Sequence, residues 1–190
     1  KKSEGDPLTI GYLGSMDTAY SFEEVLKFFQ NFLKFHNNSN LKILSRFDRE
    51  DLFILLKKYK IPRSKVQLNY VLREKLNKEI NTFDMVIFYL IENYSLIASM
   101  PTKVGEALSC GKPIICNTFN VDIAELVENN NIGCLYNFKD EYESSVHEKI
   151  MALVSSGAVK NNCIKLAKTE FNLISAAQDY LEIYNKVTES

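Results

Sequence analysis

The stretch ASMPTKVGEALSCGKPIICN, from Ala98 to Asn117, holds one complete repeat of the predicted fold. Ser99 is expected to cap a helix, and Pro101 suits the first turn because its missing N–H would have no helical partner there. The apolar run KPIICN (112–117) that follows has the length and composition of a buried strand. The stretch therefore predicts a turn, a helix and a strand in succession.

The same alternation begins near the amino terminus. LTIGYLG (8–14) is a short apolar run ended by glycine, which predicts a strand, and SFEEVLKFFQNFLKFH (21–36) has apolar residues at helical spacing. Ser21 and Glu24 have the S-x-x-E spacing of a capping box, in which each side chain accepts from a backbone N–H of the other residue. A helix is therefore expected to begin there.

Further units lie between and beyond these two. Strands are predicted at 41–45, 65–71, 83–90 and 132–137, and helices at 49–58 (with Asp48 as its cap), 72–80, 121–129, 142–155, 158–168 and 172–187. Short, continuous apolar strands joined by helices require a parallel sheet that is covered on both faces. The predicted fold is α/β, a doubly wound, parallel, six-stranded sheet with C-terminal helices. No Pro/Gly/Ser-rich linker divides the chain, so residues 1–190 are expected to form a single domain.

The composition argues against several function classes. A net charge of -1 provides no cationic field for a nucleic acid backbone or an anionic bilayer. No stretch reaches the roughly 18 uncharged apolar residues that a membrane span needs, and the start KKSEGDP is not a signal peptide. We therefore expect no transmembrane segment and no nucleic acid partner.

Cysteine and histidine usage indicates neither disulfides nor a metal. No two of the four cysteines have CxxC spacing: they are Cys110, Cys116, Cys134 and Cys163. Reduced thiols in the cytoplasm are the expected state. His36 and His147 stand far apart in the sequence without a helical partner, so surface histidines are expected rather than metal ligands.

Ligands of open parallel sheets bind beyond the carboxyl ends of the strands. There the helix after Pro101 combines unpaired N–H groups with Lys103, which indicates an anion site. Glu106 would repel a phosphate unless it accepts from hydroxyl groups, as from the ribose of a nucleotide diphosphate. An ordinary helix start with a solvated Lys103 is the alternative. Gly11 and Gly14 do not form G-x-G-x-x-G, which disfavours a nicotinamide or flavin site.

SMPTKVGEALSCGKPIICN, followed by VDIAELVENNNIGCLY, resembles the donor-binding half of GT-B glycosyltransferases. The resemblance is to the retaining family 4, the glycosyl transferases group 1, whose pattern is S-x-P-x-K-x-x-E-x-L-x-x-G-x-P-V-I. IGYLGSMDTAYSFEEVL is similar to the first strand, glycine loop and helix of that carboxy-terminal half, and AQDYLEIYNKV to its closing helix. The resemblance implies that the sheet is the Rossmann-like half of a GT-B fold.

The resemblance also implies transfer of a sugar from a nucleotide diphosphate, UDP- or GDP-linked, to a glycan, lipid or protein acceptor, without a metal or other cofactor. Glu106 would bind the ribose, and Pro101, Thr102 and Lys103 would lie along the diphosphate. The glycine loop beneath the diphosphate would contain Gly14 and Ser15, and Val71 and Leu72 would contact the base.

Two departures from the family pattern concern catalysis. The family often has a glutamate eight positions before the one matched by Glu106, where this chain has Ala98. It also often has an arginine and a lysine after the first strand, where GSMDTAYSFEE offers Ser15, Asp17 and Tyr20. Arg46 or Lys103 would then have to compensate.

A GT-B enzyme closes two such domains over its acceptor, and the chain is long enough for one. The resemblance therefore implies that the N-terminal acceptor domain is absent from this chain and that the isolated domain is inactive. The whole enzyme would build polysaccharide or glycoprotein in the cytoplasm, with any contact to the inner membrane face made by the missing half. Two alternatives remain: a nucleotide-sugar epimerase and a non-catalytic interaction module of the same fold.

Overall fold

The computed structural model describes residues 5–16 and 19–188. Its six strands are β1 (Thr9–Leu13), β2 (Asn40–Leu44), β3 (Val66–Asn69), β4 (Met85–Ile87), β5 (Ile114–Cys116) and β6 (Gly133–Leu135). They form one sheet in the order β3-β2-β1-β4-β5-β6, and every neighbouring pair is parallel. The predicted doubly wound α/β fold is confirmed, and its strand order reverses between β1 and β4.

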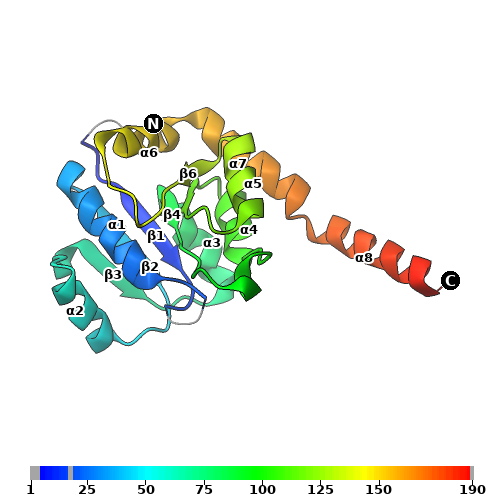
Figure 1. The fold of residues 1–190 in the computed structure, drawn as a ribbon, viewed down its shortest axis with the longest axis horizontal. Coiled ribbons are helices and arrows are strands. Elements are labelled where there is room, and N and C mark those ends of the chain that lie inside the picture. The colour runs from blue at the N-terminus through cyan, green and yellow to red at the C-terminus, as the bar shows by residue number, and fades with distance from the viewer. Residues whose placement is uncertain (1–4, 17–18, 189–190) are drawn as a thin grey trace.

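The helices alternate with the strands and then continue beyond them. They are α1 (Phe22–Phe35), α2 (Arg49–Lys58), α3 (Arg73–Asn81), α4 (Thr102–Ser109), α5 (Val121–Asn130), α6 (Ser144–Ser155), α7 (Gly157–Glu170) and α8 (Leu173–Thr188). Short 3-10 turns occupy Arg63–Lys65 and Tyr94–Leu96. Figure 1 shows α1 and α2 in front of the sheet and α3 behind it. Helix α6 packs beside α1 and β6, and α7 beside α4 and α5.

The core lies on both faces of the sheet, as a parallel sheet requires. The central strands bury nearly every side chain, including Ile10 and Tyr12 of β1 and all three residues of β4. Helix α1 contributes four phenylalanines to this core, at positions 22, 28, 29 and 32. Gly133 of β6 sits so close to β5 that a Cβ would lie 2.1 Å from the Ile114 carbonyl oxygen, so this strand pairing requires glycine.

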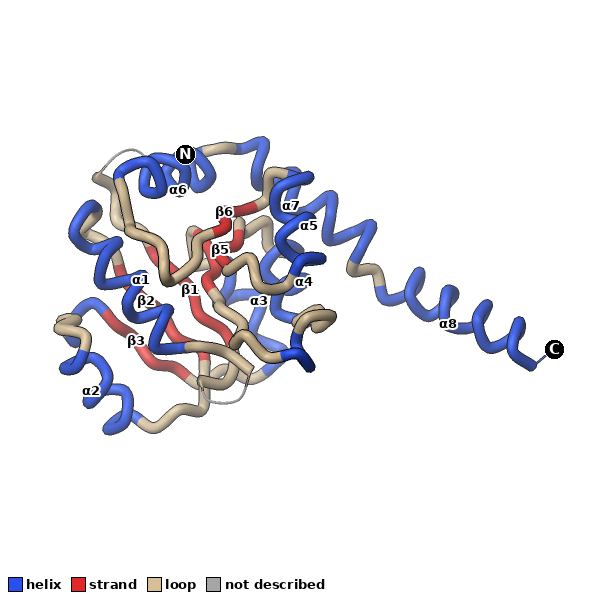
Figure 2. The backbone as a smooth tube through the Cα atoms, in the orientation of Figure 1, coloured by secondary structure: helices blue, strands red, loops and turns tan. Residues whose placement is uncertain are grey.

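Helix α8 differs from the others because none of its residues is buried. It extends away from the body of the domain in both ribbon and tube views (Figures 1 and 2). Its apolar side chains are largely exposed, Leu173 at 83% and Ile174 at 72%. The predicted helix at 172–187 is thus present, but none of its described residues is buried.

The predicted caps of α1 and α2 have different outcomes. Asp48 caps α2 as expected, because its carboxylate accepts from the backbone N–H groups of Glu50 and Asp51 at 2.7 and 3.2 Å. The capping box at α1 was wrong, because Ser21 is the N-cap residue but its side chain makes no capping hydrogen bond. Glu24 instead pairs with Lys27 at 2.6 Å, one turn further along the helix.

The expectation of two surface histidines was also wrong. His36 is buried, its Nε2 lies 2.8 Å from the Asp6 carbonyl oxygen, and its ring centroid lies 5.8 Å from that of His147. The two rings meet because the end of α1 packs beside the start of α6, a contact that sequence spacing does not reveal. All four cysteines are free thiols, as predicted, and all but Cys110 are buried.

Candidate functional site

A cavity of about 680 Å³ opens at the carboxyl ends of β1, β2 and β3 and is bounded on one side by the first turns of α4. It contains seven of the predicted site residues: Gly14, Ser15, Arg46, Val71, Thr102, Lys103 and Glu106. The two others lie next to it in the chain. Leu72 precedes α3 and is 55% exposed, whereas Pro101 is buried as the N-cap residue of α4. The structure thus brings most of the predicted site residues together at one cavity, although they make up fewer than half of its lining.

The cavity floor turns at Gly14. Its φ of +107° is a conformation that side-chain-bearing residues rarely adopt, and its N–H donates to the Leu44 carbonyl at 3.1 Å. A Cβ at this position would lie 2.7 Å from Nζ of Lys103. Glycine is therefore favoured by the backbone turn, and a Cβ at this position would require the Lys103 side chain to shift.

Lys103 reaches under this turn from α4. Its Nζ donates to the Leu13 carbonyl and lies 3.2 Å from the centroid of the Tyr20 ring and 5.4 Å from that of Tyr12. The side chain is only 7% exposed, so the alternative of a solvated lysine was wrong. Burial lowers the pKa of Lys103 to about 7, with a smaller opposing effect from the Glu106 carboxylate. The cavity thus has a cation in its floor, and this cation titrates near neutral pH.

Helix α4 begins at Thr102, and Pro101 provides no side-chain cap. The expectation that Ser99 caps this helix was wrong, because the N-cap residue is Pro101, two residues later, and no side chain caps the helix. The Ser99 carbonyl accepts from Nδ2 of Asn120 at 2.8 Å. The first-turn N–H groups of Thr102 and Lys103 are therefore left for another acceptor. Such an uncapped helix start beside a lysine favours an anion.

Gly105 and Glu106 occupy different faces of α4. Gly105 faces α7, since a Cβ there would lie 2.8 Å from the ring of Phe171 at the end of that helix. Glu106 is half-buried and lines the cavity. Within the part of the chain that the structure describes, the Glu106 carboxylate makes no side-chain hydrogen bond or ion pair. It remains available to accept from a ligand.

Arg46 and Tyr70 form a pair at the other end of the cavity, and only Arg46 was predicted as a site residue. Nη2 of Arg46 donates to the Tyr70 hydroxyl at 2.6 Å, and the guanidinium carbon lies 4.7 Å from the centroid of that ring. Tyr70 was missed because the sequence placed it inside a strand at 65–71. Strand β3 ends at Asn69, so Tyr70 falls in the loop that lines the cavity.

Backbone contacts tie the β1–α1 connection to the end of β4. Tyr20 and Leu90 form an isolated antiparallel bridge, and the Ser21 N–H donates to the Tyr89 carbonyl at 2.9 Å. The Ile91 N–H donates to the Ala19 carbonyl at 3.1 Å. These bonds hold Tyr20 against Lys103. Sequence periodicity does not predict these hydrogen bonds, because they join two loops rather than two strands.

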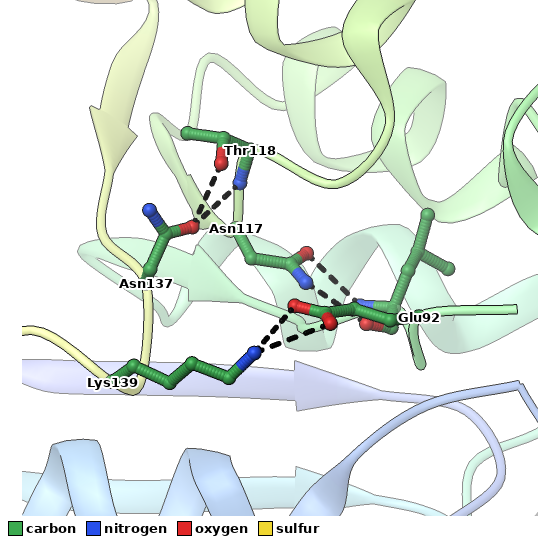
Figure 3. A network of polar contacts seen from close by, with 6 residues as sticks. Glu92, Asn117, Thr118, Asn137 and Lys139 are labelled. Carbon is green, nitrogen blue, oxygen red and sulfur yellow. Dashed lines mark hydrogen bonds and ion pairs between the residues drawn. The ribbon is translucent and has the colours of Figure 1, made fainter.

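A polar network lies at the ends of β4, β5 and β6, as Figure 3 shows. Buried Asn117 accepts from the Leu90 N–H at 3.2 Å and donates to the Leu90 carbonyl at 2.9 Å, so its amide continues the ladder beyond β4. Farther out, Asn137 accepts from Thr118, and Lys139 pairs with Glu92 at 3.3 Å. In the sequence, this network was indicated only by Asn117, the polar residue that directly follows the apolar run of β5.

The departures from the family pattern remain in the structure. Ala98 is exposed in the loop before α4, and the nearby Glu92 is directed to Lys139 and does not line the cavity. Asp17 lies outside the described residues. Of the basic residues expected to compensate, Arg46 lines the outer cavity, whereas Lys103 is buried in its floor.

The described chain contains neither a cluster of metal-binding side chains nor a helix suited to span a membrane. Within residues 5–16 and 19–188, no three His, Cys, Asp or Glu side chains are grouped in a way that could hold a metal ion. None of the described helices combines the length and the apolar character needed to cross a membrane.

The strand order and the cavity at the carboxyl edge define a Rossmann-like α/β domain, a class that binds ligands at this edge. The sequence model of the family described as "Glycosyl transferases group 1" matches residues 1–170. The chain belongs to this family. A search of curated proteins found no match.

Solved structures with the same fold are GT-B glycosyltransferases. Sucrose-phosphate synthase from Thermosynechococcus elongatus has a TM-score of 0.77 at 15% identity, with 97% of this chain and 46% of that chain covered. HepE from Anabaena, in complex with UDP-glucose, has a TM-score of 0.73 at 13% identity, with coverages of 95% and 49%. TarM from S. aureus, in a complex that includes UDP, has a TM-score of 0.68 at 15% identity, with coverages of 93% and 35%. The chain therefore spans less than half the length of each of these three proteins.

Proposed function

We propose that this chain is the nucleotide-sugar donor-binding domain of a retaining glycosyltransferase that transfers a sugar from UDP or GDP to a glycan, lipid or protein acceptor. The observation that carries the proposal is the first turn of α4. It joins uncapped N–H groups, the Lys103 cation and, one turn further, the unpaired Glu106 carboxylate along one cavity wall. An anion site and a hydroxyl acceptor at this spacing suit a diphosphate followed by a ribose.

The anion would lie between the Gly14 turn and the start of α4. The partial positive charge at the helix N-terminus and the buried ammonium of Lys103 both favour negative charge there. During transfer, the bond between the anomeric carbon and the diphosphate oxygen breaks, and its electron pair stays with the diphosphate. A new bond forms to the acceptor oxygen, which loses its proton. Groups that stabilise charge on the departing diphosphate therefore lower the barrier.

These same groups would supply the charge that a divalent cation supplies elsewhere, so we propose that donor binding needs no metal. Because the chain spans less than half the length of the three glycosyltransferases compared above, the acceptor and the group that takes its proton are assigned to a second domain. We therefore propose that the isolated chain binds donor but does not transfer sugar. The four free thiols suit the reducing cytoplasm that the sequence predicted for the enzyme.

A thermal-shift titration with UDP, GDP, ADP and CMP, with and without magnesium, tests the proposal, because a ligand that binds only the folded state raises the midpoint of unfolding. We expect a metal-independent shift with UDP or GDP. The Glu106→Ala variant should lose most of that shift. Glu92→Ala, which removes an exposed carboxylate outside the cavity, is the matched control and should keep it. Equal shifts in the two variants would remove Glu106 from the site.

A non-catalytic interaction module is the second candidate, and Ala98 favours it because a sugar-facing glutamate is missing there. Transfer by the two-domain protein that contains this chain would exclude it. A nucleotide-sugar epimerase is less well supported, since neither His36 nor His147 lines the cavity. Release of an epimerised sugar nucleotide, with no product on an acceptor, would favour the epimerase.

A further inference from the structure

The two ends of the cavity differ in chemistry. The α4 end provides N–H groups and Lys103, whereas the opposite wall includes Asp48 and Asp51. Asp48 is committed to the N-terminus of α2, and both carboxylates are exposed. Two negative charges on that wall disfavour a diphosphate there. Arg46 also lies at that end, but the α4 end alone combines a cation with free N–H groups and lacks the two aspartates, which favours a nucleotide with its phosphates toward α4 and its base toward the ends of β2 and β3.

The wall at the ends of β2 and β3 suits a flat heterocycle. Phe47, Val71 and Leu76 are partly buried side chains that pack against the core and also line the cavity. These residues line the same cavity as Glu106, the proposed ribose acceptor. Their apolar surfaces can cover the faces of a base, while its polar edge needs hydrogen-bonding partners.

Arg46 is the cationic side chain at this end of the cavity. Within the described chain it makes one side-chain hydrogen bond, to Tyr70, and no ion pair with a carboxylate. A guanidinium has five N–H donors in a planar fork, so most of them remain available. The Tyr70 hydroxyl and ring hold the plane of the guanidinium from one side. Arg46 is therefore a donor group, oriented by Tyr70, at the edge of an apolar wall.

We propose that Arg46, positioned by Tyr70, donates to a keto oxygen of the nucleobase, so that the cavity prefers uracil and guanine to cytosine and adenine. This inference rests on the proposed function and identifies the part of the donor that the site selects. At the relevant edge, uracil presents the O4 acceptor and guanine the O6 acceptor. Cytosine and adenine present amino groups there, and two donors facing each other leave both unsatisfied.

UDP and CDP provide the sharpest comparison, because their bases have the same size and differ at the C4 substituent and at the N3 proton. Calorimetric titration of the chain should show UDP binding about tenfold or more tighter than CDP. In Arg46→Met, UDP binding should weaken until the ratio approaches one. Arg49→Met, an exposed arginine outside this cavity, is the matched control and should keep the full ratio.

Inorganic pyrophosphate separates this role from a direct contact between Arg46 and the phosphates. It lacks a base, so Arg46→Met should leave its affinity within about twofold. Tyr70→Phe keeps the ring but removes the hydroxyl that accepts from Nη2, and should lower the UDP to CDP ratio only partly. Tyr70→Ala should lower it nearly as far as Arg46→Met does, again without affecting pyrophosphate. Both residues are exposed, so unfolding midpoints should stay unchanged.

Each adverse outcome has a distinct meaning. A ratio near one in the unsubstituted chain, or equal losses of UDP, CDP and pyrophosphate in Arg46→Met, overturns the keto-base inference and leaves the donor-binding proposal standing. An unchanged ratio in Arg46→Met overturns it as well. Failure of every nucleotide and of pyrophosphate to bind overturns the inference together with the proposed function.

Discussion

Nζ of Lys103 lies 3.2 Å from the centroid of the Tyr20 ring, beneath the Gly14 turn. A cation over an aromatic face is stabilised by the ring electrons, while its removal from water favours the neutral amine. Burial is the larger effect here and lowers the pKa of Lys103 to about 7, with a smaller opposing effect from the Glu106 carboxylate. The charge that the site offers to an anion therefore depends on pH in the physiological range.

Diphosphate affinity should fall as the pH rises above about 7. The free chain loses the ammonium proton through this pKa, and a bound anion favours the protonated form, so affinity decreases by up to about tenfold per pH unit. Titration of UDP between pH 6 and pH 9 measures this slope. Lys103→Arg keeps its charge throughout and should give a flatter profile. Parallel profiles would show that Lys103 does not titrate in binding.

The same group should affect stability with the opposite pH trend. Folding lowers the pKa of Lys103, so between about 7 and the ordinary lysine value the unfolded chain binds more protons than the folded one. The contribution of Lys103 is therefore unfavourable below about pH 7 and disappears as the pH rises toward 10. Denaturant unfolding of the unsubstituted chain and of Lys103→Met should show their stability difference changing in Lys103's favour over this window.

Gly14→Ala should damage both the turn and the lysine site. A φ of +107° is strained for alanine by about 1–3 kcal/mol, and the added Cβ would meet Nζ of Lys103 at 2.7 Å. Loss of nucleotide binding and a lower free energy of unfolding are expected. In a Lys103→Met background the Cβ meets no ammonium, so the cost should be smaller. Additive effects in this double-mutant cycle would argue against the contact.

Asn117→Ala should destabilise the domain by about 2–4 kcal/mol. It leaves the Leu90 N–H and carbonyl without partners in a buried position, and each unsatisfied group costs roughly 1–3 kcal/mol. Urea unfolding measures the change. Asn137→Ala removes two hydrogen bonds to the exposed Thr118 and is the control, with an expected loss below about 1 kcal/mol. Comparable losses in the two variants would contradict the role assigned to Asn117.

Gly133→Ala should be more damaging than either asparagine change. Its Cβ would lie 2.1 Å from the backbone oxygen of Ile114, and a backbone atom in a strand cannot move aside as a flexible side chain can. We expect β6 to lose its pairing and the chain to unfold at markedly lower denaturant concentration. Gly157→Ala, where an added Cβ meets no atom within 4 Å, provides the control.

Sequence periodicity predicted the units of this fold because each strand and helix is local. Helix α2 was predicted with its observed bounds, Arg49–Lys58, since Asp48 provides a cap that depends only on its immediate neighbours. Five of the six strands were predicted too long, as at 83–90, where the ladder covers only Met85–Ile87. Beyond Ile87 the chain is buried like a strand, but the Asn117 side chain supplies its hydrogen bonds at Leu90. Sequence periodicity predicts which residues are buried, whereas a strand is defined by its backbone pairing. Here the buried segment continues beyond the paired one.

The candidate site was predictable where it depends on one helix start. Thr102, Lys103 and Glu106 share the first turns of α4, so their proximity followed from spacing alone. The burial of Lys103 could not be predicted from spacing, because it depends on contact with Tyr20. Tyr20 is in turn held by backbone pairing between two loops. Tyr70 likewise needed the true end of β3 before its contact with Arg46 could be seen.

The backbone bonds that anchor the β1–α1 connection also bear on the thermodynamics of binding. Gly14 is bonded to β2 at one end of this connection, and Ala19 and Ser21 are bonded to the end of β4 at the other. Anchors that are ordered before a ligand arrives leave less conformational entropy to be lost on association. Ligand binding at the cavity floor should therefore begin from a preorganised surface. Little of the binding free energy would be lost to ordering these anchors.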